Sequence, residues 1–416
     1  MRWPSRLFAA AIAAALQACA TAPVNAPPLA SRSVAPVEQR APVTILVSID
    51  GFRPDYLTRG VTPNLNALAR AGISAAMRPS FPSVTFPNHW TLVTGLRPDR
   101  HGIVGNRMED ADHPGMIFTM QSEEPFWWDA AEPLWITAEK AGIRTATMFW
   151  PGANIDFSGR RPSDWQQYGH EVSNRQRVDA VIDWLRRPAA TRPRFLTLYF
   201  DVVDSAGHKY GPDDARTTAV VGEVDAAIGR LRTELAGLGQ PANLVIVADH
   251  GMAPISAERV VRLDRQLPTG TFTAITDGPY AGITPLAGHE TAVGAVLLKP
   301  QPHLTCWAKK NVPARLHYGQ NDRVPPFICL AETGWLAATR SPPADRPPSG
   351  GAHGYDPDAP EMAALFVASG PDIAPRGALA AFDNVDVAPL IRDLLKLPAD
   401  PALDGNDAPF RQALRR

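Results

Sequence analysis

The chain has 416 residues, 45% of them hydrophobic and 20% charged, and a formal net charge of −1. This composition is that of a globular protein, and the length suffices for one large α/β domain with an inserted lobe or for two ordinary domains. A net charge this close to zero provides no long-range positive potential to attract a nucleic-acid polymer. A small nucleotide could still be a substrate, because local groups would hold it.

Residues 1–19 predict an export signal. Two arginines precede the apolar run Leu7–Leu16, which is too short to span a bilayer. The run ends in Leu16-Gln17-Ala18-Cys19, which resembles a bacterial lipoprotein box and favours lipidation of Cys19. Cleavage between Ala18 and Ala22 without lipidation is the alternative, because Gln17 fits the box poorly. Both alternatives predict an exported, periplasmic protein. Position 20, which follows Cys19, is Ala and not Asp. If the protein is a lipoprotein, the absence of Asp at this position indicates the outer membrane.

Residues 20–41 are rich in Ala, Pro, Ser and Val and lack periodicity, which predicts a tether. If Cys19 is lipidated or removed, two cysteines remain, Cys306 and Cys329. An oxidising compartment would allow them to form a disulfide; two unpaired buried thiols are the alternative.

The segment 42–410 predicts an α/β catalytic domain with a mainly parallel central sheet and helices on both faces. Short apolar runs rich in β-branched residues predict its buried strands. These are Val43–Ile49, Phe195–Phe200, Asn243–Ala248 and Ala363–Ala368. Helical patterns lie between them, at Asn64–Ala71, Phe86–Thr94, Leu134–Ala141, Gln176–Arg186 and Thr217–Leu238. Many Pro and Gly interrupt the pattern at about 270–348, which predicts an inserted lobe.

Acidic and histidine residues follow the predicted strands, where open α/β sheets bind ligands. The candidate ligands are Asp50, Asp204, His208, Asp249, His250 and His353. Imidazole nitrogen mixed with carboxylate oxygen suits zinc better than magnesium or calcium, while manganese, iron and cobalt are weaker alternatives. Six ligands exceed one tetrahedral ion but fit two ions that clamp a phosphate. Taken singly, an Asp at the end of a strand more often forms a turn or caps a helix, and a His is more often a hydrogen-bonded structural residue. The shared placement of the six residues favours a metal site.

Five short motifs occur along the chain in the same order as in a known protein family. They are Val-Ser-Ile-Asp-Gly at 47–51, Thr-Phe-Pro-Asn-His at 85–89, Asp204 with Gly207-His208, Asp-His-Gly-Met at 249–252 and His-Gly-Tyr-Asp at 353–356. From about Val43 to about Asn406 the sequence resembles the nucleotide pyrophosphatase/phosphodiesterase family of the alkaline phosphatase superfamily. The chain departs from the family's frequent Glu and Pro at Asp201 and Val203, neither of which is a predicted ligand.

The resemblance implies a site with two zinc ions. Asp204, His208 and His353 would hold one ion. Asp50, Asp249 and His250 would hold the other, with the Thr85 oxygen as a further ligand. Asn106 would donate to a phosphate oxygen, and Phe86 and Tyr199 would sandwich the base of a nucleotide. His89 and His101 are assigned structural roles.

Thr85 is the predicted nucleophile. A helix start favours an anion, Pro87 fits the first turn, and a bound zinc lowers the pKa of a nearby hydroxyl. Attack on phosphorus would give a phospho-threonine that water then hydrolyses. A mere helix N-cap is the alternative role. A sulfatase is discounted, because the Cys or Ser that becomes formylglycine, with its Pro and Arg, is missing.

The predicted function is therefore release of nucleoside 5′-monophosphates from phosphodiester and pyrophosphate bonds. A phosphodiesterase for phospholipid headgroups or glycerophosphodiesters on the same scaffold is one alternative. A catalytically silent metal-binding surface protein is the other. No feature of the sequence indicates the oligomeric state.

Overall fold

The structure is a computed structural model that describes residues 38–341, 345 and 347–415. The predicted signal peptide, Cys19 and nearly all of the predicted tether lie outside these residues. Residues from Arg40 onward form one compact unit. Within the described part of the chain, no helix combines the length and apolar character needed to cross a bilayer.

A nine-stranded sheet lies at the centre of this unit, in the order β18-β2-β17-β8-β1-β7-β5-β6, with β19 also pairing with β2. Only β17 runs antiparallel to its neighbours, which confirms the predicted mainly parallel sheet. The strands are β1 (Val43–Ile49), β2 (Ile73–Arg78), β5 (Thr145–Met148), β6 (Asp164–Gln166), β7 (Phe195–Phe200), β8 (Ala242–Val247), β17 (Ala364–Ser369), β18 (Gly377–Ala378) and β19 (Phe382–Asp383).

Strand β1 lies between β7 and β8, so the three strands that precede the candidate ligands are direct neighbours. Val47 is paired with Leu198 on one side and with Ile246 on the other. All seven residues of β1 are buried. A strand buried on both faces explains the continuous apolar run in the sequence. The in-register pairing also brings the carboxyl ends of these strands to one edge.

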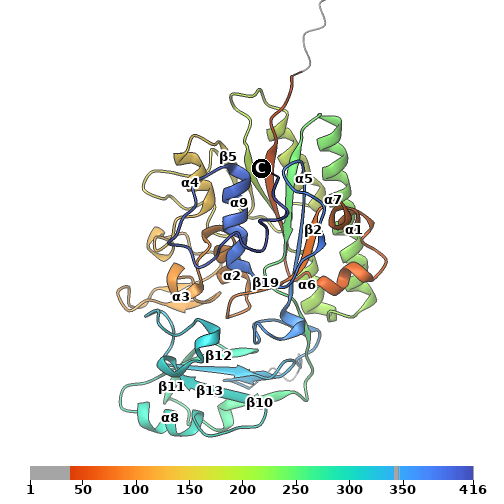
Figure 1. The fold of residues 1–416 in the computed structure, drawn as a ribbon. Coiled ribbons are helices and arrows are strands. Elements are labelled where there is room, and N and C mark those ends of the chain that lie inside the picture. The colour runs from red at the N-terminus through yellow and green to blue at the C-terminus, as the bar shows by residue number, and fades with distance from the viewer. Residues whose placement is uncertain (1–37, 342–344, 346, 416) are drawn as a thin grey trace, which may run out of the picture. The chain divides into compact units, whose positions relative to one another are not determined.

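Helices cover both faces of the sheet, as Figure 1 shows. One group packs around the long helix α7: α1 (Pro63–Ala71), α5 (Asn174–Leu185), α6 (Val202–Tyr210) and α7 (Ala215–Gly237). The other group is α2 (Thr85–Thr94), α3 (Pro98–His101), α4 (Leu134–Lys140) and α9 (Val387–Leu395). The five predicted helices are present with ends shifted by one or two residues. Tertiary contacts rather than periodicity set such ends, and Ser173 with Gln176 forms a capping box that starts α5 two residues early.

A second sheet lies within the range predicted for the inserted lobe. Its antiparallel strands follow the order β11-β12-β14-β13. They are β11 (Phe272–Thr276), β12 (Tyr280–Pro285), β13 (Leu304–Ala308) and β14 (Phe327–Ala331), and helix α8 (Glu290–Leu297) packs on them. Cys306 and Cys329 face each other across β13 and β14 and form a disulfide, so the free-thiol alternative is wrong.

Three short strand pairs complete the described chain. Strand β10 (Val260–Arg262) pairs with β15 (Leu336–Ala338). Strand β9 (Ala253–Pro254) pairs with β16 (Gly351–Ala352), which joins the two ends of the segment that carries the second sheet. Strands β3 (Met108–Glu109) and β4 (Ile117–Phe118) form a small hairpin. Pairing of β9 with β16 brings His353 back to the carboxyl end of β8.

Candidate metal centre and active site

The six predicted ligands converge at the carboxyl ends of β1, β7 and β8. Asp50 directly follows β1, and Asp249 and His250 follow β8. Asp204 and His208 lie one turn apart on α6, the helix that follows β7. His353 follows β16. The sequence left open whether Asp204 and His208 lie on a helix or a tight loop, and the structure places them on a helix.

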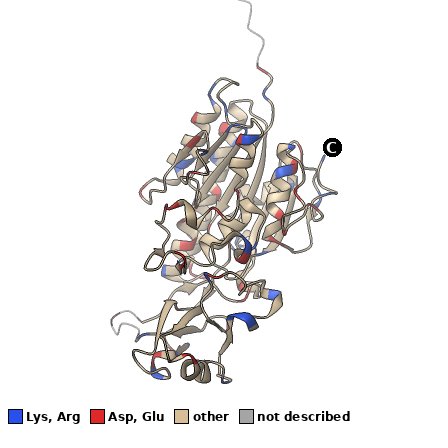
Figure 2. Cartoon of the chain, turned by 90° about the vertical axis from the view of Figure 1, so that its left-hand side faces the viewer, with Lys and Arg blue, Asp and Glu red and all other residues tan. Residues whose placement is uncertain are grey.

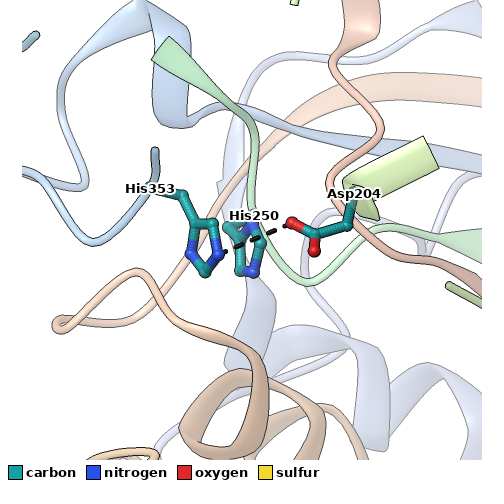
Figure 3. A group of neighbouring side chains, drawn as sticks. All are labelled: Asp204, His250 and His353. Atoms are coloured by element: carbon teal, nitrogen blue, oxygen red, sulfur yellow. Dashed lines mark ion pairs between the residues drawn. The ribbon is translucent and has the colours of Figure 1, made fainter. Parts of the chain in front are cut away.

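Asp204, His208 and His353 form one group of donor atoms. The Nε2 atoms of His208 and His353 lie 3.4 and 3.5 Å from Oδ1 of Asp204. The same two Nε2 atoms are 3.1 Å apart. Figure 3 shows Asp204 pointing toward His353, with His250 beside it.

The second group surrounds Nε2 of His250. This atom is 3.0 Å from Oδ2 of Asp249 and 3.5 Å from Oδ1 of Asp50. The hydroxyl of Thr85 lies 3.3 Å from the same nitrogen. The two groups adjoin, because the rings of His250 and His353 stack with centroids 3.6 Å apart. Donor atoms of Asp204, His250 and His353 also lie within 4.8 Å of one another.

Each of the three imidazoles has its Nδ1 occupied by a backbone carbonyl. His208 contacts the carbonyl of Gly351 at 2.8 Å, His353 that of Ser83 at 3.0 Å, and His250 that of Gly251 at 2.9 Å. A carbonyl oxygen only accepts, so Nδ1 carries the proton in each ring and Nε2 presents a lone pair. Such hydrogen bonds to the distal nitrogen are typical of histidines that bind metals.

The carboxylates also have an oxygen that faces the centre without a partner. Oδ1 of Asp50, Oδ1 of Asp204 and Oδ2 of Asp249 are buried and accept no hydrogen bond. Burial, and then the neighbouring carboxylates, raise the pKa of Asp50 well above its usual value. Burial also raises the pKa of Asp204. Lone pairs and carboxylate oxygens crowded in this way repel each other unless a cation lies between them, so the donors fit bound metal ions.

Glycines allow the ligand-bearing loops to approach closely. Gly51 adopts a φ of +68°, and a Cβ there would lie 3.0 Å from Cα of Asp204. Its N–H donates to Oδ1 of Asp249 at 3.2 Å. Gly350 adopts a φ of +81°, and a Cβ there would lie 2.0 Å from the carbonyl oxygen of His208. The left-handed conformation and the lack of space both favour glycine at these positions.

Thr85 is the first residue of α2, and Val84 occupies the N-cap position. The N-cap interpretation of Thr85 is therefore wrong. The loop before α2 is held by Asn88, whose side chain donates to the carbonyls of Pro82 and Val84 and accepts from the N–H of Ser80. This network presents the Thr85 hydroxyl toward His250 from the N-terminal end of a helix, where an anion is favoured.

Asn106 lies next to the start of α2. Its Oδ1 accepts a hydrogen bond from the backbone N–H of Phe86 at 2.9 Å. With the oxygen used in this way, the amide nitrogen is the group left to donate to a ligand. This orientation suits the predicted contact with a phosphate oxygen.

A cavity of about 460 Å³ opens beside the two groups, and Thr85, Phe86, Asn106 and Tyr199 all line it. The hydroxyl of Tyr199 donates to Oδ2 of Asp50 at 2.7 Å, so this residue also contacts a candidate ligand. Tyr168, which was not among the predicted site residues, lines the same cavity with a half-exposed ring. No motif surrounds Tyr168, and only the pairing of β6 with β5 brings it to this edge.

The sequence profile of a family described as type I phosphodiesterase/nucleotide pyrophosphatase matches residues 44–356. The chain belongs to this family. The family is part of the alkaline phosphatase superfamily, and the fold is alkaline phosphatase-like.

Two curated relatives illustrate the membership. A bis(5′-adenosyl)-triphosphatase from Xenopus laevis is 37% identical over 370 residues, which cover 88% of this chain and 80% of the relative. Ectonucleotide pyrophosphatase/phosphodiesterase family member 1 from Mus musculus is 34% identical over 385 residues. That match covers 88% of this chain but only 42% of the longer mouse protein.

Solved structures of family members share the fold. Murine ectonucleotide pyrophosphatase/phosphodiesterase 5, as an inactive threonine-to-alanine variant in complex with AMP, superposes with a TM-score of 0.85 at 33% identity. The human protein of the same name gives a TM-score of 0.84 at 32% identity. Each match covers 90% of this chain and 100% of the solved chain.

Proposed function

We propose that this family member hydrolyses phosphodiester and pyrophosphate bonds of nucleotides and releases nucleoside 5′-monophosphates. The observation that carries the proposal is the Thr85 hydroxyl, 3.3 Å from Nε2 of His250 and at the wall of a cavity with aromatic lining. Family membership supports it, as do the names of the relatives and the AMP bound to the murine protein.

We propose zinc as the metal, with two ions per chain. Asp204, His208 and His353 would hold one ion. Asp50, Asp249, His250 and the Thr85 oxygen would hold the other. The three Nε2 lone pairs and the three unpartnered carboxylate oxygens support this assignment, because mixed nitrogen and oxygen donors suit zinc. Bound zinc supplies Lewis acidity that lowers the pKa of a hydroxyl and offsets charge on phosphate oxygens.

Thr85 acts as the nucleophile in the proposed reaction. Its Oγ1 bonds to phosphorus while the bond from phosphorus to the leaving oxygen breaks. Asn106 donates its amide N–H to a phosphoryl oxygen, and the N-terminal end of α2 favours the same negative charge. Water then attacks the phospho-threonine and regenerates the hydroxyl, which splits one displacement into two.

Phe86 and Tyr199 are the proposed contacts of the nucleotide base. Phe86 packs edge-on against Phe118 and lies beside Trp128, so its ring has a fixed position in the cavity wall. Tyr199 lies edge-on to His89 and Tyr168. Stacking of a base on such rings contributes about 1–3 kcal/mol per base.

The nucleophile is tested with Thr85→Ala. We expect loss of turnover on the 4-nitrophenyl ester of thymidine 5′-monophosphate, with two zinc equivalents retained by elemental analysis. Thr85→Ser is the matched control and should keep part of the activity, because it keeps a hydroxyl. Wild-type turnover by pure Thr85→Ala protein would remove Thr85 from the mechanism. A glycerophosphocholine and a phosphomonoester in the same panel test the alternative headgroup activity.

We also propose export to the periplasm, with lipidation of Cys19. The disulfide between Cys306 and Cys329 supports an oxidising compartment. Mass spectrometry of the mature N-terminus from the native host tests this proposal. A diacylglyceryl modification that disappears in Cys19→Ala is the expected result, whereas an unmodified N-terminus beyond residue 19 would contradict it.

A further inference from the structure

The lining of the cavity contains no Lys or Arg among the described residues. Apart from the candidate metal ligands, its ionisable groups that bear on charge are Glu123, Asp201 and His170. Both signs of charge are interspersed over the chain in Figure 2, with no large region of one sign around the sheet. Beyond the metal centre, this wall therefore offers a phosphate no guanidinium or ammonium group.

Asp201 is already neutralised by its own partner. Its Oδ1 accepts from Nη1 of Arg177 at 2.6 Å, and both side chains are buried. Its Oδ2 accepts from the Tyr168 hydroxyl at 2.8 Å and from Nδ1 of His170 at 3.0 Å. Arg177 is thus committed behind the wall and cannot reach an anion in the cavity.

Glu123 adds a carboxylate to the cavity lining. Its Oε1 accepts from Nδ2 of Asn154 at 2.7 Å and from the side-chain amide of Gln167. Both donors are neutral amides, so they connect three loop segments without offsetting the charge. An anionic group placed near this carboxylate would be repelled.

The mouth is also apolar. We define the apolar rim as Met120 and Tyr168, whose large hydrophobic side chains are 51% and 49% exposed. Met120 and Tyr168 line the cavity itself. Exposed apolar side chains concentrated at one place mark a contact surface, and Met and aromatic rings adapt to flat ligands.

We propose that this cavity selects nucleotide diesters whose leaving group is an uncharged alcohol with an aromatic or apolar face, and disfavours nucleoside triphosphates. The inference rests on the proposed function. The metal ions that the centre would hold would offset the charge of the reacting phosphoryl group. Each further phosphate of a triphosphate would need a cationic partner that the wall lacks, whereas an aryl or nucleoside alcohol gains contact with the apolar rim.

The test compares two substrates that share the thymidine 5′-monophosphoryl group, its 4-nitrophenyl ester and thymidine 5′-triphosphate. We expect wild-type kcat/KM to favour the ester at least about 10-fold. Intrinsic leaving-group reactivity cancels when the ratio is compared between variants. Met120→Lys places a cation at the mouth and should shift the ratio toward the triphosphate about 5- to 10-fold, less so at high salt.

Leu298→Lys is the matched control, because Leu298 is 50% exposed against 51% for Met120 but does not line the cavity. It should leave the ratio within about twofold of wild type. Met120→Gln removes the apolar contact without adding charge and should raise KM for the ester alone. The inference is overturned if Met120→Lys and Leu298→Lys shift the ratio equally, or if wild type binds the triphosphate as well as the ester. Hydrolysis of neither substrate would instead contradict the proposed function.

Discussion

The hydroxyl of Tyr199 donates a hydrogen bond to Oδ2 of Asp50, 2.7 Å away, from a ring that also lines the substrate cavity. Burial, and then the charge of Asp50, raise the pKa of this phenol well above its usual value, so it stays a donor. Tyr199 therefore has two separable parts, a ring for the proposed base and a hydroxyl for the metal centre.

Replacing Tyr199 separates these parts. We expect Tyr199→Phe to lower kcat about 3- to 10-fold on nucleotide esters and simple aryl phosphodiesters alike, because the hydrogen bond to Asp50 is lost. Tyr199→Ala should in addition raise KM for the nucleotide esters only. Steady-state kinetics on both substrate classes provide the measurement. Equal losses on both classes in Tyr199→Ala would count against base stacking.

His89 has more than the structural role assigned from the sequence. Its Nδ1 lies 2.9 Å from the carbonyl of Thr85 and 3.4 Å from Oδ2 of Asp249, both of which only accept. Its Nε2 therefore accepts from the hydroxyl of Ser48 at 2.9 Å. This buried ring joins β1, α2 and the end of β8, which carry three of the groups around His250.

Two amide replacements distinguish the nitrogens of His89. The Asn amide reaches the position of Nδ1, whereas the Gln amide reaches that of Nε2. We expect His89→Gln to weaken one of two zinc equivalents about 10- to 100-fold and His89→Asn to weaken it less. Competition with a chromophoric chelator measures both affinities. If the two variants lose both equivalents to the same extent, His89 acts through general packing instead.

Removal of metal should destabilise the protein as well as inactivate it. Three buried carboxylates and three imidazole lone pairs would then face one another without a cation. Ions bound at about 1,000 times their Kd stabilise by about 4 kcal/mol each, so we expect chelation to lower Tm by about 5–15 °C. Scanning calorimetry with elemental analysis checks this, and two zinc equivalents should restore Tm. Full restoration by a single equivalent would contradict the two-ion site.

His101 predicts a specific loss of stability in acid. Burial lowers the pKa of His101 from 6.5 to about 3. Its Nδ1 accepts from the N–H of Ile103 at 3.2 Å, so the folded protein holds the neutral ring. As the pH falls below 6.5, His101 becomes protonated in the unfolded chain but stays neutral in the folded protein. The free energy of unfolding therefore falls by up to about 1.4 kcal/mol per pH unit.

Urea unfolding at pH 7.5 and 5.5 measures this contribution. His101→Gln removes the titrating ring and should reduce the difference in unfolding free energy between the two pH values by about 1 kcal/mol. His170→Gln is the comparison for the loss of an exposed imidazole, because the His170 side chain is 74% exposed. A pH difference equal to that of wild type in His101→Gln would refute the assignment.

Much of the fold and the ligand set could be predicted from the order of residues. Strands β1, β7 and β8 are short apolar runs, and the residue types that follow a buried strand are read directly from the chain. In a parallel sheet, residues that follow neighbouring strands share one edge, so Asp50, Asp204 and Asp249 were expected together. These predictions depend on local patterning and one general rule of sheet topology.

The remaining features depend on contacts between residues far apart in the chain. No local pattern encodes contacts between residues this far apart in the sequence. Examples are the antiparallel direction of β17, the position of His250 between both donor groups and the hydrogen bond from Tyr199 to Asp50. The same holds for Tyr168, which reaches the cavity only because β6 pairs with β5, and for Arg177, which is held away from the cavity by Asp201. Packing decides which side chains meet and which charges are already paired, and so determines the chemistry that the cavity accepts.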